Sequence, residues 1–268
     1  MSTMTLHRPA ARELKVTQAR VVKSEWIKFW SLRSTVITLT ISVAVFIGIG
    51  LLAASMLGSG NTNGPGAGVS SPITASLAGA GLAQLAFGTL GVLFMAGEYS
   101  TGMIRSSLAA VPKRLPVLWA KIAVFTGVVF VVALVASAIA FTGGQAIAGT
   151  AGASWSDPGV VRAVIGTAFV LTGSGVLGIG LGALLRSTPA AISTLFGAMF
   201  LVSGLAQLLL PNSWSSALQY LPSNAADSIT AVTTSSGSLV PLAGLTVFVG
   251  YLVAVVAAAG WRLKRADA

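Results

Sequence analysis

The chain has 268 residues, of which 54% are hydrophobic and only 8% are charged, and its mean hydropathy is +0.88. A soluble globular domain carries about 25% charged residues, so this chain has too few charges to cover a surface that faces water. The composition excludes a soluble domain and predicts an all-α integral membrane protein. The length accommodates about six spans of roughly 20 residues.

The formal net charge is +10, but the basic residues cluster beside apolar stretches. This placement favours contact with anionic lipid headgroups and control of membrane topology over binding to nucleic acid. The absence of cysteine excludes disulfides, thiolate metal sites and cysteine nucleophiles. The single histidine, His7, lies in a polar tail, and we do not expect it to bind metal or act as a base.

Residues 1–34 are predicted to form a cytoplasmic tail followed by an interfacial helix. Between Arg12 and Arg33 the pattern is helical, with apolar residues on one face and basic residues around much of the remainder. A basic helix with tryptophans beside a span is typical of a helix that lies in the headgroup region; the alternative is a solvated tail. The apolar face is formed by Leu14, Val22, Trp26, Phe29 and Trp30. The residues expected at the interface are Glu25, Trp26, Lys28, Phe29, Trp30 and Arg33.

A six-span transmembrane domain is predicted over residues 35–261, and a cytoplasmic tail over 262–268. The first apolar run is longer than the core of a signal peptide, so we expect it to remain as a membrane helix. The spans are expected at about 35–57, 73–96, 122–141, 163–185, 190–210 and 239–261. In the segment 211–238, short helices at the outer mouth are expected over Ser215–Tyr220 and in the stretch that begins at Ser223.

The basic residues also predict the orientation of the spans. With six spans, 15 of the 16 Lys and Arg residues fall on one side and only Arg162 falls on the other. Because basic loops stay in the cytoplasm, both termini are expected there, in a multi-pass protein of the cytoplasmic membrane.

A polar, basic island, Gly97–Lys121, separates the second span from the third. Its first part is predicted to form a short amphipathic cytoplasmic helix over about 98–111, followed by a basic elbow at Lys113 and Arg114. Glu98 is expected either to pair with a basic group on a partner or to cap this helix. The alternative is an anchor helix that faces lipid and only sets topology.

The spans themselves carry almost no ionisable groups, which argues against ion-coupled transport. The chain contains no phosphate-binding loop, no zinc motif and no nucleophile elbow, so we do not expect an enzyme or a bound cofactor or metal. Glycines are dense in the second and fourth spans and are expected to allow close packing of helices. Packing within one subunit and contact between two subunits both remain open.

Four segments of the chain carry a resemblance to a known family: Ser24–Lys28 with Leu32–Thr35, Gly97–Arg105, Leu108–Arg114 and Leu221–Asn224. They resemble segments of the membrane permease subunits of bacterial type-2 ABC exporters, and the last of them resembles the outer segment before the final span of that family. The resemblance implies a coupling helix that docks on a separate ATP-binding subunit, which would bind ATP and Mg. It also implies a second permease copy, as a homodimer or a heterodimer. The residues it assigns to coupling are Glu98, Thr101, Gly102, Met103, Ile104, Arg105, Leu108, Lys113 and Arg114. Met103 stands where threonine is commoner in the family.

Two other functions remain open at this stage. One is a membrane scaffold or immunity factor that does not transport, and the other is an ion-coupled secondary transporter. The sequence does not name a cargo, because exporters of drugs, peptides, lipids and polysaccharides share this plan.

Overall fold

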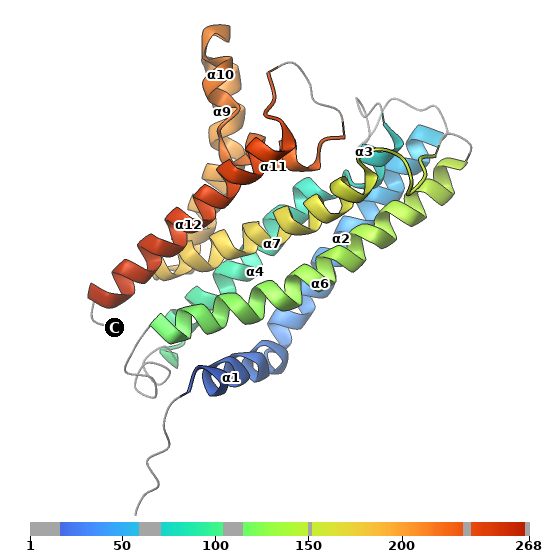
Figure 1. The fold of residues 1–268 in the computed structure, drawn as a ribbon. Helices are drawn as coiled ribbons and strands as arrows, with labels where there is room; N and C mark the ends of the chain where they lie inside the picture. The colour runs from blue at the N-terminus through green and yellow to red at the C-terminus, as the bar shows by residue number, and fades with distance from the viewer. Residues whose placement is uncertain (1–16, 59–70, 104–114, 150–151, 233–236, 266–268) are drawn as a thin grey trace, which may run out of the picture.

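The computed structural model describes residues 17–58, 71–103, 115–149, 152–232 and 237–265 (Figure 1). Across these ranges the regular structure is helical, without a β-strand. Helix α1 spans Gln18–Ser31 and is followed directly by α2, Arg33–Gly58. The helices after them are α3 Pro72–Ser76, α4 Ala80–Ser100, α6 Leu115–Ala148 and α7 Val160–Leu185.

The C-terminal part begins with a helix that contains a π-helical turn: α8 Thr188–Phe196, η2 Gly197–Leu201 and α9 Val202–Leu209. Three short helices follow, η3 Asn212–Trp214, α10 Ser215–Leu218 and α11 Pro222–Thr230. The last helix is α12, Pro241–Arg265. The two stretches of the outer segment for which short helices were predicted correspond to α10 and α11.

Six helical segments of the described chain are long and apolar enough to cross a membrane, as the sequence predicts. They are Arg33–Leu57, Pro72–Ser100, Leu115–Ala148, Val160–Leu185, Thr188–Leu209 and Pro241–Arg265. This architecture is that of an all-helical, multi-pass membrane protein.

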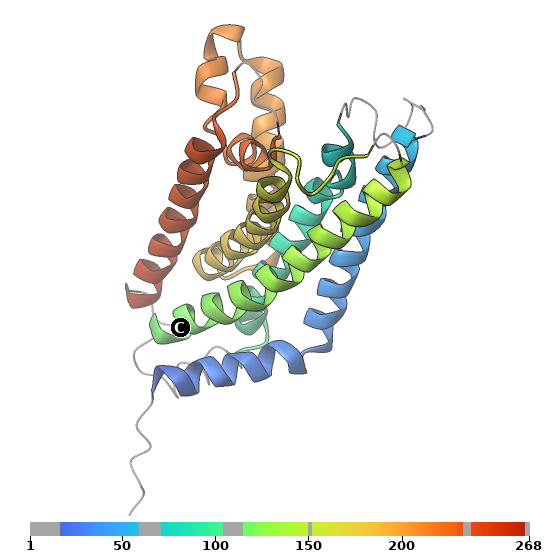
Figure 2. The same cartoon turned by 45° about the vertical axis from the view of Figure 1, so that its right-hand side comes forward.

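The long helices lie side by side, and α1 lies across one end of them (Figures 1 and 2). Helix α4 packs extensively on α7, α6 packs on both α2 and α7, and α12 packs on the other side of α7. Helices α10 and α11 are at the end opposite α1, whereas the C-terminus of α12 is at the α1 end. The α1 end therefore also holds the end of α4, the beginning of α6 and the end of α7.

Two helices extend further into the polar island than the hydropathy pattern indicates. The second span was expected to end at residue 96 and the third to begin at 122, but α4 ends at Ser100 and α6 begins at Leu115. A helix continues beyond its apolar stretch as long as its backbone hydrogen bonds are satisfied. Helix α4 stops where Gly102 adopts a φ of +71°, a left-handed conformation that glycine adopts without strain.

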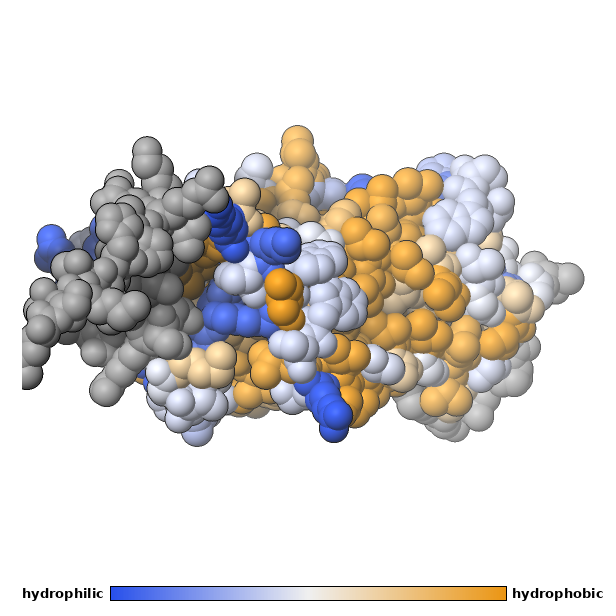
Figure 3. Space-filling view, turned by 90° about the horizontal axis from the view of Figure 1, so that it is seen from below, coloured by the Kyte–Doolittle hydropathy of each residue, from blue (hydrophilic) through white to orange (hydrophobic). Residues whose placement is uncertain are grey.

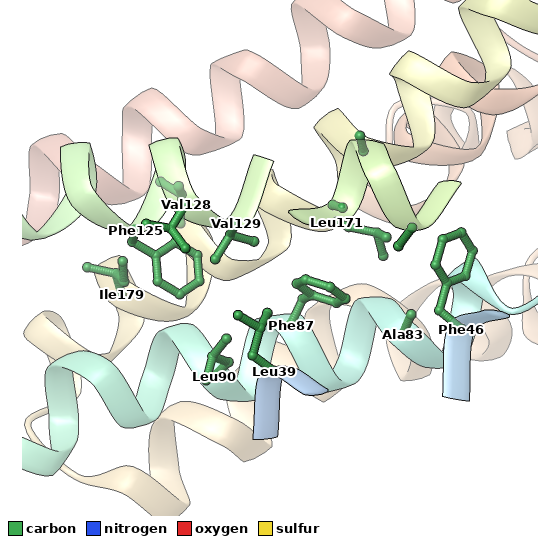
Figure 4. Packing of buried hydrophobic residues seen from close by; sticks show 14 of the residues in the cluster. Leu39, Phe46, Ala83, Phe87, Leu90, Phe125, Val128, Val129, Leu171 and Ile179 are labelled. Carbon is green, nitrogen blue, oxygen red and sulfur yellow. The ribbon is translucent and has the colours of Figure 1, made fainter. Parts of the chain in front are cut away.

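The contact between α4 and α7 depends on glycine. A Cβ atom on Gly91 would overlap the carbonyl oxygen of Gly175, and one on Gly178 would overlap the carbonyl oxygen of Gly88. Because glycine has no side chain, the backbones of α4 and α7 approach each other closely within one subunit. Small residues commonly allow such close packing between membrane helices. Around this contact, Phe87 and Leu90 of α4 face Phe125 of α6 in a continuous apolar core (Figure 4).

The outer surface of the bundle is apolar over a broad area, next to hydrophilic side chains gathered at the α1 end (Figure 3). Leu208 of α9 and Leu242 of α12 are 80% and 72% exposed. The exposure of such large apolar side chains to water would be unfavourable, but they are expected on a surface that faces lipid.

Candidate functional site

Four charged residues form a buried cluster where α1 crosses the ends of α4 and α6. This ion cluster consists of Glu25 and Lys28 of α1, Glu98 of α4 and Lys121 of α6. The Nζ atom of Lys121 lies 2.8 Å from Oε2 of Glu25 and 2.8 Å from Oε1 of Glu98. The Nζ atom of Lys28 lies 2.9 Å from Oε1 of Glu25 and 3.0 Å from Oε1 of Glu98. Each lysine therefore bridges both carboxylates.

The cluster is deeply buried and its formal charges sum to zero. Lys121 is 0% exposed, Glu25 1% and Glu98 8%. Burying an unpaired charge is very costly, so two carboxylates in this position require two cations. Loss of any one member would leave an uncompensated charge at the junction of three helices.

An aromatic layer lies against the ion cluster. Phe29 of α1 is fully buried, and its ring packs edge-on against Phe94 of α4, with the ring centroids 5.4 Å apart. Phe125 of α6 completes the group, at 6.4 Å from Phe29 and 6.0 Å from Phe94. The Nζ atom of Lys121 lies 4.4 Å from the centroid of the Phe94 ring, a cation–π distance. The aromatic rings exclude water from one side of the charges, which strengthens the ion pairs.

Helical spacing explains why α1 contributes to both layers. Its buried residues are Val21, Glu25 and Phe29, which recur every four positions and so form one stripe. Lys28 follows Glu25 by three positions and reaches the same face. The interfacial face predicted from the sequence is therefore wrong for Phe29, which faces the bundle. Trp26 and Trp30 lie beside the stripe and are 49% and 46% exposed.

The pKa of Lys28, at the edge of the cluster, reflects the opposing effects of burial and of the two carboxylates. Burial lowers it, but the hydrogen bond to Glu25 and the charges of Glu25 and Glu98 outweigh burial, so the pKa rises above its ordinary 10.5. Lys28 is therefore charged at neutral pH, and its contribution to stability is lost only as the pH rises through this elevated pKa.

Tyr99, the residue after Glu98, contacts the end of α7. The ring of Tyr99 lies 5.4 Å from the guanidinium carbon of Arg186, which caps the C-terminus of α7 with a φ of +55°. Glu98 contacts α1 and α6, whereas Tyr99 contacts the end of α7. The last turn of α4 is thus attached on both sides.

A pocket of about 270 Å³ borders the ion cluster, between the elbow that joins α1 to α2 and the last turns of α4. Its lining is mostly apolar, with several hydroxyl groups at the start of α2. Lys28 and Glu98 form its charged wall, and Thr101 and Met103 lie at its rim.

The residues expected at the coupling helix fall into two groups. Glu98, Thr101, Gly102 and Met103 lie in or directly after α4, and the last three are exposed. The residues outside the described part of the chain are Ile104, Arg105, Leu108, Lys113 and Arg114. Glu98 was expected to begin a separate helix and to meet a partner or cap that helix. It lies instead within α4 and pairs with Lys28 and Lys121 of its own chain.

Lys121 is the member of the cluster that the sequence analysis missed as a site residue. It was counted only as a topology signal at the end of the island. The available signal was its position two residues after Trp119 and directly before a long apolar run, where a lysine is costly unless it is paired. The structure places it inside the helix that was expected to begin at residue 122.

A second, larger cavity of about 390 Å³ lies at the opposite end of the molecule. It lies between α9, α10, α11 and residues 237–239 just before α12, and Asp227 is the charged side chain in its described lining. Although solvent reaches this carboxylate, loss of hydration within the cavity raises the pKa of Asp227 to about 6. Arg162, at the start of α7, donates to the backbone oxygen of Ala231 at the end of α11, at 2.8 Å.

Among the described residues, no three histidine, aspartate or glutamate side chains are grouped as metal ligands would be. Comparison of the sequence with protein-family models and with curated proteins finds no match.

Proposed function

We propose that this chain is the membrane permease subunit of a type-2 ABC exporter and couples to a separate ATP-binding subunit. The observation that carries the proposal is the ion cluster. Glu25 and Lys28 belong to one of the segments that resemble the family, and Glu98 belongs to another, 70 positions away from Lys28. Three ion pairs link these two segments directly or through Lys121.

The geometry suggests how such a chain would be driven. Residues 101–114 connect the end of α4 to the beginning of α6, and both of these ends are held by the cluster. A push on this connection from a cytoplasmic partner would reach α1 and α6 through Glu98 and Lys121. It would reach α7 through Tyr99 and Arg186. ATP and Mg would be bound by the partner, and a second permease copy would complete the pathway.

The proposed orientation puts the ion cluster on the cytoplasmic side. Basic residues gather at the α1 end, in α1, at the start of α2 and at the end of α12, whereas Arg162 lies at the start of α7. The positive-inside rule then assigns the α1 end to the cytoplasm. In this orientation Trp26 and Trp30 are at the level of the lipid headgroups, which is where tryptophan is enriched.

One observation also favours the secondary transporter. Lys121 lies within a candidate span, and three of the four cluster residues are less than one tenth exposed. Buried ionisable groups in membrane helices often serve proton or ion transfer. All four residues form ion pairs within the cluster, which argues for a structural role instead, because a transfer site needs a group that can release its partner.

Affinity purification of the tagged chain from its native membrane tests the proposal. We expect a protein with Walker-type ATP-binding motifs to co-purify, and Ile104→Asp to abolish this association while membrane insertion is retained. Ser154→Asp, an exposed position at the opposite end of the bundle, is the matched control and should keep the partner. Purification without any ATP-binding protein, or retention of that protein by Ile104→Asp, would reject the coupling assignment.

A further inference from the structure

We infer that the groove between the beginning of α6 and the end of α12 binds one anionic phospholipid, through Lys264 and Arg265. This inference rests on the membrane location of the chain and does not depend on the exporter proposal. The groove has a volume of about 260 Å³. The residues of this α6–α12 groove that carry the argument are Leu115, Leu118, Trp119, Gly260, Trp261 and Lys264.

Two tryptophans form its walls. Trp119 is 55% exposed and Trp261 is 58% exposed, and both line the groove from opposite helices. Each lies near the end of a candidate membrane span, Leu115–Ala148 or Pro241–Arg265. An exposed tryptophan at a span end is suited to the glycerol and headgroup region, where its ring contacts acyl carbon and its N–H contacts water or phosphate.

The floor of the groove is apolar. A Cβ atom on Gly260 would lie 3.4 Å from Cδ2 of Leu115 and 3.9 Å from Cδ2 of Leu118, which are ordinary van der Waals distances, so α12 lies next to these leucines here. The floor continues along α12 through Val256 and Ala257, away from the charged end. An acyl chain that follows this floor would bring its headgroup to the end of α12.

Among the residues that the structure describes at the end of α12, the charged side chains are all positive. Arg262, Lys264 and Arg265 occupy the last turn of α12, and neither α6 nor α12 contains an acidic residue. Within the described part of the chain, neither Lys264 nor Arg265 forms an ion pair. The guanidinium of Arg265 lies over the Trp261 ring, with its central carbon 4.6 Å from the centroid. That stacking leaves the guanidinium edge, which carries its N–H donors, able to bind a phosphate oxygen.

Charge complementarity therefore selects the occupant. A phosphodiester with a net negative headgroup satisfies Lys264 and Arg265, while its glycerol and acyl carbons contact Trp119 and Trp261. A zwitterionic lipid of the same shape brings a positive group to the same place and is disfavoured. Each basic residue near an anionic lipid surface strengthens binding by about fivefold.

Native mass spectrometry of the full chain in detergent tests this site. Phosphatidylglycerol should bind at lower concentration than phosphatidylcholine with the same acyl chains. The variant Lys264→Gln/Arg265→Gln should weaken phosphatidylglycerol binding by roughly 25-fold, about fivefold for each residue. The matched control is Lys23→Gln/Arg162→Gln, which removes the same charge from exposed positions of α1 and α7 and should leave binding unchanged.

Two further arms identify the ligand and its position. Phosphatidylglycerol with bromines near the headgroup should quench Trp119 and Trp261 more than Trp155, which is near the opposite end. Inorganic phosphate in large excess should not displace the lipid, because it makes no contact with the tryptophans. Equal binding of phosphatidylcholine, equal loss in the control variant, or displacement by phosphate would each overturn the inference.

Discussion

The Nζ atom of Lys121 lies 2.8 Å from Oε1 of Glu98, and this ion pair joins the two ends of the polar island Gly97–Lys121. Because Glu25 and Lys28 meet the same two residues, the pair also fixes α1 across the bundle. Three separate parts of the sequence thus share one neutral, buried cluster.

Charge balance in this cluster is open to direct test. We expect Lys121→Met to lower the free energy of unfolding by about 3–5 kcal/mol, because it leaves two buried carboxylates with one cation. Adding Glu98→Gln to this variant should recover part of the loss, since the remaining Glu25–Lys28 pair is neutral. Unfolding in mixed micelles measures both effects. Lys23→Gln, at an exposed position, should change stability by no more than about 0.5 kcal/mol. A double variant less stable than Lys121→Met would show that packing, not charge, dominates.

The two faces of α1 predict different responses to lipid. Trp26 and Trp30 are about half exposed, and we expect shallow lipid-attached quenchers to quench their fluorescence once the other four tryptophans are replaced by Phe. Quenching by aqueous iodide alone would show that α1 is solvated and does not lie in the headgroup region.

Phe29, on the buried stripe beside these tryptophans, reports on docking of α1 to the bundle. Phe29→Ala removes a fully buried ring from contact with Phe94 and Phe125, and it should destabilise the protein by about 3–5 kcal/mol. Trp26→Ala serves as the control, because its ring is half exposed and its loss should cost much less. Comparable losses of unfolding free energy in the two variants would contradict the assigned faces.

Topology can be measured by cysteine labelling, because the chain has no cysteine of its own. A cysteine at Ser154 should react with an impermeant reagent added outside intact cells, and one at Ser106 should react only after the membrane is permeabilised. Outside labelling at Ser106 would overturn the proposed orientation.

Asp227 should make stability depend on pH. Its pKa rises from 3.8 to about 6 in the folded protein, so the folded state holds the proton more tightly than the unfolded state. The associated stability is present below pH 3.8 and is lost as the pH rises through about 6. Solvent reaches the carboxylate, which limits the size of the effect. Thermal unfolding of Asp227→Asn should therefore vary less between pH 4 and 7, and at pH 7 this variant should be more stable than wild type. Asp157→Asn, which alters an exposed loop, should retain the wild-type pH dependence.

The number of apolar helices follows from the sequence, because a continuous run of about 20 apolar residues has few alternatives to a membrane helix. The end of α4 and the beginning of α6 could not be predicted from the sequence. Hydropathy marks where a helix leaves the apolar phase, not where its backbone hydrogen bonds stop. Glu25, Lys28 and Glu98 were singled out individually from the sequence. Their meeting at Lys121 was not predictable, since it depends on the crossing of α1 over two helices that are distant in sequence.

The measurement that bears most directly on the proposed function is the ATP hydrolysis rate of the co-purified complex in proteoliposomes. We expect the rate to exceed that of the ATP-binding subunit alone, and we expect Ile104→Asp and Lys121→Met to abolish the increase. The first variant would break the contact with the partner, and the second would break transmission while leaving the partner bound. A hydrolysis rate that is the same with wild-type chain, with either variant and without the chain would contradict the proposal.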